Sequence, residues 1–306
     1  MKKDFESFYD ECLQDEELYV EWEVAKKEKN IKLIISLIII IIIDVCIWKL
    51  LKDYKYMIKI LCSMAFFVPI DSIIYELINK PNKGKYNKLY KKNIMNKLIN
   101  KFFDNVSYKP NKSMPESIYK FARDGHLLFI DFLYDKYYSE DYIECTIGGK
   151  NFIRMAEFKT IKYEKRVNCI INGLFVVIKL NKSIKGKLEI RPDSETKKKY
   201  KIKLDSQEFE EYFNVYTDEN ILATRILTHD IMKFLIKCRK RIGKKFAIAI
   251  IDNEMYIRVF AEEMFEPSIN NKNFIDKIRL KREYDIIEFI YELSKKMVEL
   301  INEMEI

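Results

Sequence analysis

The sequence predicts an α+β protein in which a two-helix transmembrane hairpin precedes a cytoplasmic, mostly antiparallel sheet domain with flanking helices and a long C-terminal helix. Three observations lead to this prediction. Residues 33–51 are almost entirely apolar, strand-like runs separated by turn residues follow between residues 142 and 260, and apolar residues recur every three or four positions from Ile286 onward. The expected parts are a cytoplasmic amphipathic helix at 1–30, the hairpin at 31–76, a basic juxtamembrane segment at 77–115 and the α+β domain at 116–306.

The composition excludes several classes of protein. The 55 Lys and Arg residues exceed the 47 Asp and Glu residues by a formal charge of +8, and most of the basic residues are Lys. A dedicated nucleic-acid-binding protein usually concentrates Arg on a basic face, so nucleic acid is not expected as a partner. The six cysteines form no Cys-x-x-Cys or Cys/His cluster, so we expect no metal, no cofactor and a reducing compartment.

The first 30 residues are charged but carry apolar residues at helical spacing, which predicts an amphipathic helix. The segment before the apolar run is too long and too acidic for a signal peptide. The apolar face consists of Phe5, Phe8, Tyr9, Cys12, Leu13, Tyr19, Val20 and Trp22.

The apolar stretch at residues 33–51 has the length that a membrane-spanning helix needs, because about 19 residues rise about 28 Å. The alternative is a core helix, but a core helix is rarely apolar on every side. A second stretch, residues 56–75, contains Lys59, Pro69 and Asp71, and its alternative is a helix lying at the membrane interface. Together the two stretches predict a hairpin that crosses the cell membrane twice.

Basic residues flank the predicted hairpin and are fewer in its connecting loop, which places both termini in the cytoplasm. Basic residues next to a bilayer also attract anionic lipids. The alternative is a topology signal without a binding role. The candidate lipid-binding residues are Lys80, Lys83, Lys85, Lys88, Lys91 and Lys92.

Two charges lie inside the predicted hairpin at similar depth. Asp44 is about one turn before the end of the first helix, and Lys59 is about one turn into the second. Pairing would offset the cost of a lone charge in lipid, and the alternative is that each side chain reaches the headgroups separately. Asp44 and Lys59 are therefore a candidate intramembrane ion pair.

The chain from residue 116 onward shows mixed helix and strand signals. Gly148-Gly149 predicts a hairpin between strands at 142–147 and 151–163. Asn172-Gly173 interrupts an apolar run at 167–180 in a way that predicts a bulge or bend. A helix is also expected at 117–133, and further strands at 186–191, 200–204 and 213–216.

The last third of the chain predicts two helices with a hairpin between them. Thr228 predicts the start of the first helix and Gly243 its end. Residues 246–251 and 255–260 predict a hairpin that turns at Asp252-Asn253. The C-terminal helix carries an apolar repeat, which predicts either packing on its own domain or a coiled coil through which the chain forms a homo-oligomer. This repeat consists of Ile286, Ile290, Leu293, Met297, Leu300 and Met304.

Several short segments of the chain form a recognisable set: Ser139-Glu-Asp-Tyr142, Ala156-Glu157, Asn172-Gly-Leu-Phe175, Met264-Phe-Glu-Pro267, and residues 186–193, 209–216 and 223–228. Together they resemble an uncharacterised family of bacterial membrane proteins, the domain of unknown function 3137. The similarity covers about residues 127–267 and the placement of the hairpin. The sequence departs from the family where Gly more often precedes the acidic pair at 140–141 and where Pro more often occupies position 229. The resemblance implies an architecture and no known activity, so it assigns no catalytic residue.

No catalytic motif stands out, and the catalytic residues are therefore unknown. His126 and His229 lack a nearby Ser or Cys nucleophile, which is typical of structural histidines. The seven glycines form no phosphate-binding loop. Acid–base catalysis needs two carboxylates in one cleft, which sequence does not reveal. The abundant carboxylates include Glu140, Asp141, Glu144 and Glu157.

Arg225 is a further candidate. It lies on an expected helix between apolar residues, where it can reach a carboxylate such as Asp218 or Glu157. We interpret this set as a structural pair, and the alternative is an anion-binding site.

The sequence therefore favours a membrane-anchored bacterial protein whose domain at the cytoplasmic face is a binding or regulatory module. Its expected partners are a protein or anionic lipids. The alternative is a membrane-tethered enzyme with a site built from scattered acidic residues. A concave pocket with converging carboxylates would favour the enzyme, and a flat apolar patch would favour the module.

Overall fold

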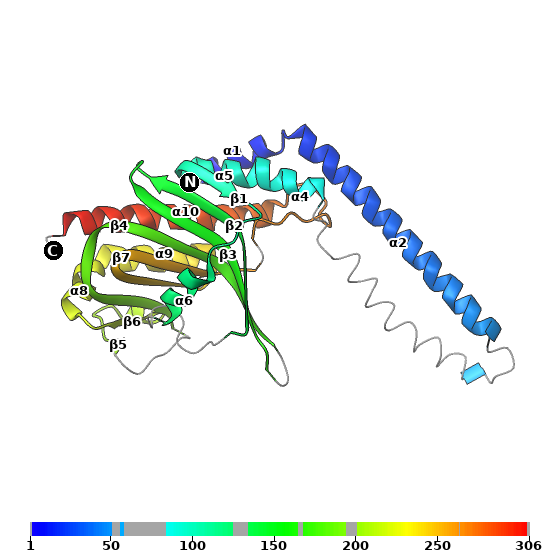
Figure 1. Ribbon diagram of the computed structural model, residues 1–306. Helices are drawn as coiled ribbons and strands as arrows, with labels where there is room; N and C mark the ends of the chain where they lie inside the picture. Colours follow the sequence, from blue (N-terminus) through cyan, green and yellow to red (C-terminus); the bar gives the residue numbers. More distant parts are fainter. Residues whose placement is uncertain are drawn as a thin grey trace. The chain divides into compact units, whose positions relative to one another are not determined.

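The architecture comes from a computed structural model that describes residues 2–50, 56–57, 84–124, 134–164, 168–193, 201–262 and 264–304. The chain forms two compact units. The first comprises Met1–Lys92 with Pro267–Lys277, and the second comprises Asn93–Glu266 with Ile278–Ile306. The second unit combines helices with an antiparallel sheet, which confirms the predicted α+β class (Figure 1).

Residues 2–102 are mainly helical where the structure describes them, and those up to Lys92 belong to the first unit. In place of one amphipathic helix at 1–30 there are two helices, α1 (Lys2–Cys12) and α2 (Glu16–Leu50). Asp15 separates them, because its side chain accepts a 2.9 Å hydrogen bond from the Leu18 N–H and so caps α2. Further along the chain come α4 (Lys85–Leu89), a π-helix η1 (Tyr90–Met95) and α5 (Asn96–Phe102).

The predicted transmembrane hairpin is wrong. α2 is one unbroken helix of 35 residues whose first half is charged (Figure 1). Its run without a charged residue, residues 33–43, rises about 16 Å, whereas the hydrocarbon core of a bilayer is about 30 Å thick. Within the described residues, no helix is both long and apolar enough to cross a membrane. Of the second stretch, residues 56–75, only Tyr56 and Met57 are described.

The second unit is built on a seven-stranded antiparallel sheet. Its strands are β1 (Asp104–Lys109), β2 (Lys136–Ile147), β3 (Asn151–Lys162), β4 (Cys169–Pro192), β5 (Lys201–Ile202), β6 (Phe213–Thr217) and β7 (Phe246–Phe260). They lie in the order β1-β2-β3-β4-β6-β5, and β7 also pairs with β4. Gly148 and Gly149, both at positive φ, turn the predicted hairpin between β2 and β3. The predicted antiparallel sheet is therefore confirmed.

β4 is a strand of 24 residues that joins two strands the sequence predicted separately. The bulge predicted at residues 172–173 is wrong, because Gly173 pairs regularly with Phe158 on β3 and with Phe260 on β7. The glycine serves close packing instead: a Cβ atom at Gly173 would lie 2.0 Å from the Val259 carbonyl oxygen.

β7 takes the place of the second predicted hairpin. It runs as one strand through Asp252, which at φ +50° forms a bulge and not a turn. The register between β4 and β7 shifts where Ile184 pairs with Asp252. Both long strands can therefore bend at the same place.

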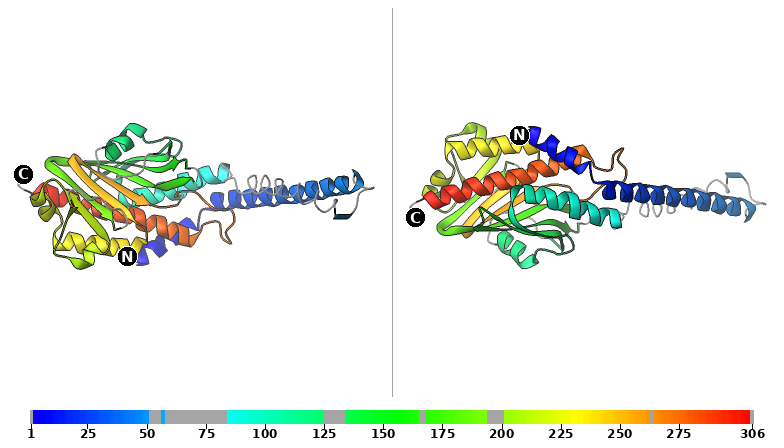
Figure 2. Two further views of the ribbon diagram at one scale, coloured as in Figure 1. Left: turned by 90° about the horizontal axis from the view of Figure 1, so that it is seen from below. Right: turned by 90° about the horizontal axis from the view of Figure 1, so that it is seen from above.

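Helices cover both faces of this sheet. They include α6 (Glu116–Asp124), α7 (Gln207–Glu210), α8 (Asn220–Ile226), α9 (His229–Ile242) and α10 (Lys277–Glu303). The Tyr119 ring on α6 lies 5.3 Å from the Phe175 ring on β4, whereas the Phe289 ring on α10 lies 4.6 Å from the Phe246 ring on β7. Ala247 belongs to the same buried cluster as Tyr119, and adjacent strand residues point to opposite faces. α6 and α10 therefore cover opposite faces (Figure 2).

The C-terminal helix packs on its own unit. Ile286, Ile290 and Leu293 of the predicted repeat are fully buried within the chain. The repeat therefore packs on its own domain, and the homo-oligomer through this helix stays a prediction.

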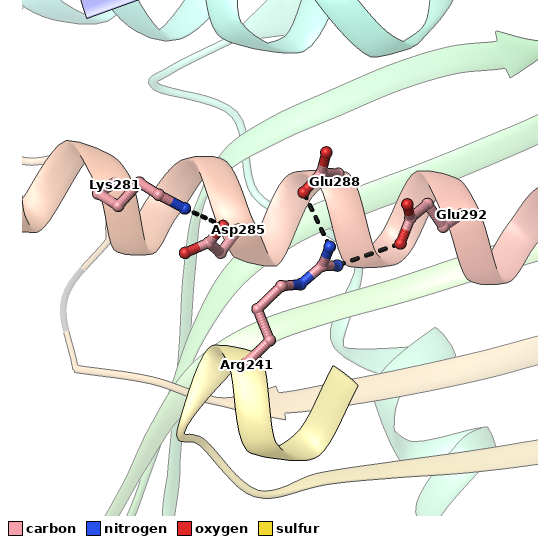
Figure 3. Close-up of polar contacts among 5 residues, drawn as sticks. All are labelled: Arg241, Lys281, Asp285, Glu288 and Glu292. Carbon is pink, nitrogen blue, oxygen red and sulfur yellow. Dashed lines mark hydrogen bonds and ion pairs between the residues drawn. The ribbon is translucent and has the colours of Figure 1, made fainter. Parts of the chain in front are cut away.

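Ion pairs fasten α9 to α10 (Figure 3). Arg241, at the end of α9, donates to Glu288 at 3.0 Å and to Glu292 at 3.1 Å. These acceptors lie one turn apart on α10, so one guanidinium bridges both. Lys281 and Asp285 form a further pair one turn apart on the same helix.

Candidate functional site

The candidate site begins at a β-bulge in β2. Glu140 pairs with Glu157 on β3, and the next paired residue, Ile143, faces Met155, so β2 has one residue more than β3 in this interval. Asp141 lies in this bulge at φ +56°, and its N–H donates to the Pro110 carbonyl at 3.0 Å. The Asp141 side chain is completely buried. In a regular strand adjacent side chains point to opposite faces, and the bulge interrupts this alternation at Asp141.

Tyr108 on β1 fixes the buried carboxylate. Its hydroxyl donates a 2.5 Å hydrogen bond to Asp141 Oδ1. Burial and the adjacent Asp141 charge raise the pKa of Tyr108 far above its ordinary range, so the phenol stays a donor.

The segment after β7 is held by two buried glutamates. The Met264 N–H donates to Glu157 Oε1 at 3.0 Å, and the next N–H, that of Phe265, donates to Glu283 Oε1 on α10 at 3.0 Å. Phe265 adopts φ +58°, which is uncommon for a bulky side chain. The two carboxyl groups hold this strained turn, and the turn places Glu266 beside the bulge.

Three carboxylates meet at this point. Oxygen atoms of Glu140, Asp141 and Glu266 all lie within 4.8 Å of one another. Glu140 is exposed, Glu266 is half-buried and Asp141 is fully buried, so the cluster runs from the surface into the interior. Hard divalent cations prefer such oxygen ligands in proteins.

The two supporting glutamates hold protons unusually tightly. Burial raises the pKa of Glu157 to about 9, and the charges of Asp141 and Glu140 add to the rise. The hydrogen bond from the Met264 N–H acts in the opposite direction and lowers this pKa. Burial likewise raises the pKa of Glu283 to about 7, opposed mainly by Arg279. Within the described residues, the second oxygen of each glutamate, Oε2, has no hydrogen-bond partner.

The structure describes only some of the residues that the sequence suggested as membrane and lipid contacts. Lys59, Lys80, Lys83 and the side chain of Asp44 lie outside the described residues, so the ion pair and part of the basic set stay predictions. Lys85 donates to Glu21 Oε1 on α2 at 2.6 Å, Lys91 is buried, and Lys88 and Lys92 are exposed.

The set of Arg225, Asp218 and Glu157 is spread over different elements. Arg225 is exposed on α8. Asp218 accepts from the Lys187 N–H at 2.6 Å, and Glu157 accepts from Met264. Each of the two carboxylates therefore has a backbone partner of its own.

Other candidates have structural surroundings. Glu144 accepts from Lys109 at 2.9 Å and from the Tyr142 hydroxyl at 2.9 Å. His229 is exposed at the start of α9, and His126 lies outside the described residues.

Sequence reasoning named Glu140, Asp141 and Glu157 but missed Tyr108, Glu266 and Glu283. The sequence did carry a signal that Glu140 and Glu157 lie close together. A hairpin that turns at residues 148–149 brings Glu140 to within one position of Glu157. Glu266 stood in a segment that carried the family resemblance, Met264-Phe-Glu-Pro267. Nothing in the sequence pattern indicated that this segment meets the bulge.

Comparison with known proteins assigns no activity. The model of a family described as Protein of unknown function (DUF3137) matches residues 169–305. This part of the chain is a domain of unknown function. It runs from β4 to the end of α10 and so includes Glu266 and Glu283, but not the β2 and β3 residues of the cluster. The membrane-protein part of the predicted resemblance is not confirmed.

No curated protein matches the chain. A solved structure, that of the mycobacterial trehalose monomycolate transport factor A, TtfA, is similar with a TM-score of 0.37 and 8% sequence identity. The similarity covers 68% of this chain and 93% of that chain. A similarity at this level says nothing about what the present chain does.

Proposed function

We propose that this chain is a binding module that associates with a lipid surface through α2. The observation that carries the proposal is an exposed run of apolar side chains on that helix. Ile34, Ile38, Ile41 and Ile42 are each at least half exposed. Monomeric proteins rarely leave so many neighbouring apolar side chains uncovered, and such surfaces mark interaction sites.

The residues at the two ends of the apolar run favour lipid over protein as the occupant. Lys26, Lys27, Lys29 and Lys32 precede it within two turns, and basic residues attract anionic headgroups. At the other end the Trp48 ring lies 5.6 Å from the Tyr56 ring, and Trp and Tyr are enriched where a bilayer meets water. A helix can bind at the membrane interface without crossing the bilayer when its apolar residues enter the boundary of the acyl chains and its charged residues stay among the headgroups.

The enzyme alternative has one observation in its favour, the convergence of Glu140, Asp141 and Glu266 beside Glu157. Carboxyl groups with shifted pKa values cluster at catalytic sites, but they also occur in structural networks. We prefer the module because the apolar surface of α2 needs a partner whatever the carboxylates do.

A vesicle flotation assay tests the proposal. The full chain is mixed with vesicles of phosphatidylcholine, with and without phosphatidylglycerol. The Ile38→Asn/Ile42→Asn variant removes two exposed apolar side chains, and Val20→Asn/Val24→Asn is the matched control, since Val20 and Val24 are equally spaced and also exposed on the charged half of α2.

We expect the wild type and the control to float with the vesicles and the Ile variant to lose about tenfold or more in binding, because the transfer of a buried Ile contributes about 1.5–3 kcal/mol. Stronger binding to the anionic vesicles would support the role of the lysines. The proposal is overturned if the wild type stays in the aqueous fraction, or if both double variants lose binding equally.

A further inference from the structure

A second feature, independent of α2, is the carboxylate cluster at the β2 bulge. We propose that Glu140, Asp141 and Glu266 form a binding site for a divalent cation, Ca²⁺ in the first place, with the buried Glu157 carboxyl at its inner wall. No sequence motif predicts this site, because its ligands come from two distant segments, β2 and the segment after β7.

The three carboxylates lie close enough together to share one cation, because each has an oxygen atom within 4.8 Å of the others. Ca²⁺ accepts flexible arrangements of carboxylate oxygens, whereas Mg²⁺ demands near-ideal octahedral geometry and keeps several of its water ligands. A site built from three protein carboxylates therefore favours Ca²⁺.

Glu157 supplies evidence that acidic residues alone would not. Its side chain is 6% exposed, and within the described residues Oε2 has no hydrogen-bond partner although Oε1 accepts from Met264. Glu157 pairs directly with Glu140 across the β2–β3 ladder, so the two side chains share one face of the sheet. Leaving a buried carboxyl oxygen without a partner is costly. A cation bound by the three carboxylates, or a water ligand of that cation, would supply a partner next to Glu157.

The electrostatics point the same way. Four carboxyl groups converge here, because Glu140 lies opposite Glu157 in the ladder and Asp141 and Glu266 lie close to Glu140. A divalent cation bound among them would lower the repulsion between the carboxylates that are charged. Exposed Glu140 and half-buried Glu266 leave a route from solvent to the fully buried Asp141.

The surrounding groups orient the ligands as the outer shell of a metal site does. The Tyr108 hydroxyl holds Asp141 Oδ1, and the Asp141 N–H is tied to the Pro110 carbonyl. Glu157 and Glu283 hold the turn that carries Glu266 through the N–H groups of Met264 and Phe265.

Titration of the chelator-treated full chain tests the site. Calorimetry measures Ca²⁺ and Mg²⁺ binding directly, and Tb³⁺ serves as a luminescent Ca²⁺ substitute excited through tyrosine. Tyr108 is bonded to Asp141, so Tb³⁺ in the cluster would lie next to a sensitising ring. We expect Ca²⁺ to bind at one site, to displace Tb³⁺ and to bind more tightly than Mg²⁺.

Four variants locate the binding. Asp141→Asn and Glu266→Gln should each weaken Ca²⁺ binding at least tenfold. Glu144→Gln is the matched control, because Glu144 also lies on β2 but is paired with Lys109. Tyr108→Phe should lower the Tb³⁺ emission more than it lowers the calorimetric affinity for Ca²⁺.

Thermal unfolding in chelator separates lost binding from lost folding. Removing one negative charge relieves repulsion, so Asp141→Asn and Glu266→Gln should stay folded without the ion, while Ca²⁺ should raise the unfolding temperature of the wild type alone. If either variant fails to fold, the wild-type titration and the Ca²⁺-dependent shift decide. The proposal is overturned if the wild type shows neither Ca²⁺ heat nor Tyr-sensitised Tb³⁺ emission, or if Glu144→Gln weakens binding as much as Asp141→Asn.

Discussion

Two long helices of this chain use apolar residues in opposite ways. α2 has 35 residues and leaves Ile38 and Ile42 at least half exposed, whereas α10 has 27 residues and buries Ile286 and Ile290 completely. The difference lies in the pattern. α10 repeats apolar residues every three or four positions, so one face meets the sheet and the other stays polar, while α2 is apolar on nearly every side from residue 33 to 43. The chain covers the apolar stripe of α10 with its own sheet, whereas Ile38 and Ile42 of α2 stay exposed.

The largest expected effect comes from a substitution on α10. It tests whether apolar residues of α10 contribute more to the free energy of unfolding than those of α2, as their burial predicts. Phe289→Ala on α10 removes the ring that packs 4.6 Å from Phe246, and we expect it to lower the free energy of unfolding by about 3–5 kcal/mol. Ile38→Ala on α2, half exposed, should change it by less than about 0.5 kcal/mol. Urea denaturation measures both values. A loss of more than 2 kcal/mol for Ile38→Ala would mean that the chain itself covers α2 in solution.

A second test concerns the buried acid on α10. The pKa of Glu283 is raised to about 7 by burial, so the folded state binds its proton more tightly than the unfolded state does. The stability from this proton is fully present below about pH 4.5 and is lost as the pH rises through about 7, a change of the order of 3 kcal/mol.

Glu283→Gln should flatten the fall in stability between pH 5 and 8, because the amide cannot titrate but still accepts from the Phe265 N–H. Urea denaturation at several pH values, in chelator, measures the profile. Glu28→Gln, exposed on α2, is the control and should leave the wild-type profile unchanged. An unchanged profile for Glu283→Gln would contradict the prediction.

The smallest expected effect compares ion pairs on the two helices. Arg241→Ala removes the guanidinium that bridges Glu288 and Glu292 (Figure 3), and both Arg241 and Glu288 are largely buried. We expect a loss of about 1–3 kcal/mol, because Glu288 would lose a charged partner in a partly desolvated site. Lys85→Ala breaks the pair with Glu21 on α2, but Lys85 is exposed, and no measurable loss is expected. Equal losses for the two variants would show that the α9–α10 bridge is no stronger than a surface pair.

Local sequence rules predicted features whose cause is local. Thr228 caps α9 by accepting from the Ile231 N–H at 3.4 Å, and Gly243 ends it at φ +62°. The turn at Gly148-Gly149 also formed where expected, because positive φ at both positions suits a hairpin turn.

Features that depend on distant partners escaped prediction. Asp252 looked like a turn residue, but β4 continues past it, so a bulge replaces the turn. Gly173 looked like a bend, yet it is needed for contact with Val259. The candidate site follows the same rule, since Glu266 meets Asp141 only when the segment after β7 packs beside the β2 bulge.

The apolar stretch of α2 shows the limit of composition as evidence. Residues 33–43 are as apolar as a membrane span, but a charged segment precedes them within the same helix and Asp44 follows them. Within the described residues, no helix combines the length and the apolar character of a span, and the uncharged run of α2 rises only about 16 Å.

The central place of β4 also sets the order in which the sheet can assemble. β4 pairs with β3, β6 and β7, and its partner β7 is the last strand in the chain. Between Gly173 and Lys179 one edge of β4 pairs with β3 and the other with β7. During synthesis this second edge has no strand beside it until β7 emerges. Pairings between such distant segments form slowly, and an open strand edge is prone to join the wrong partner. The last strand to be made therefore completes the sheet, and a chaperone that shields the open edge of β4 would act in the interval before it arrives.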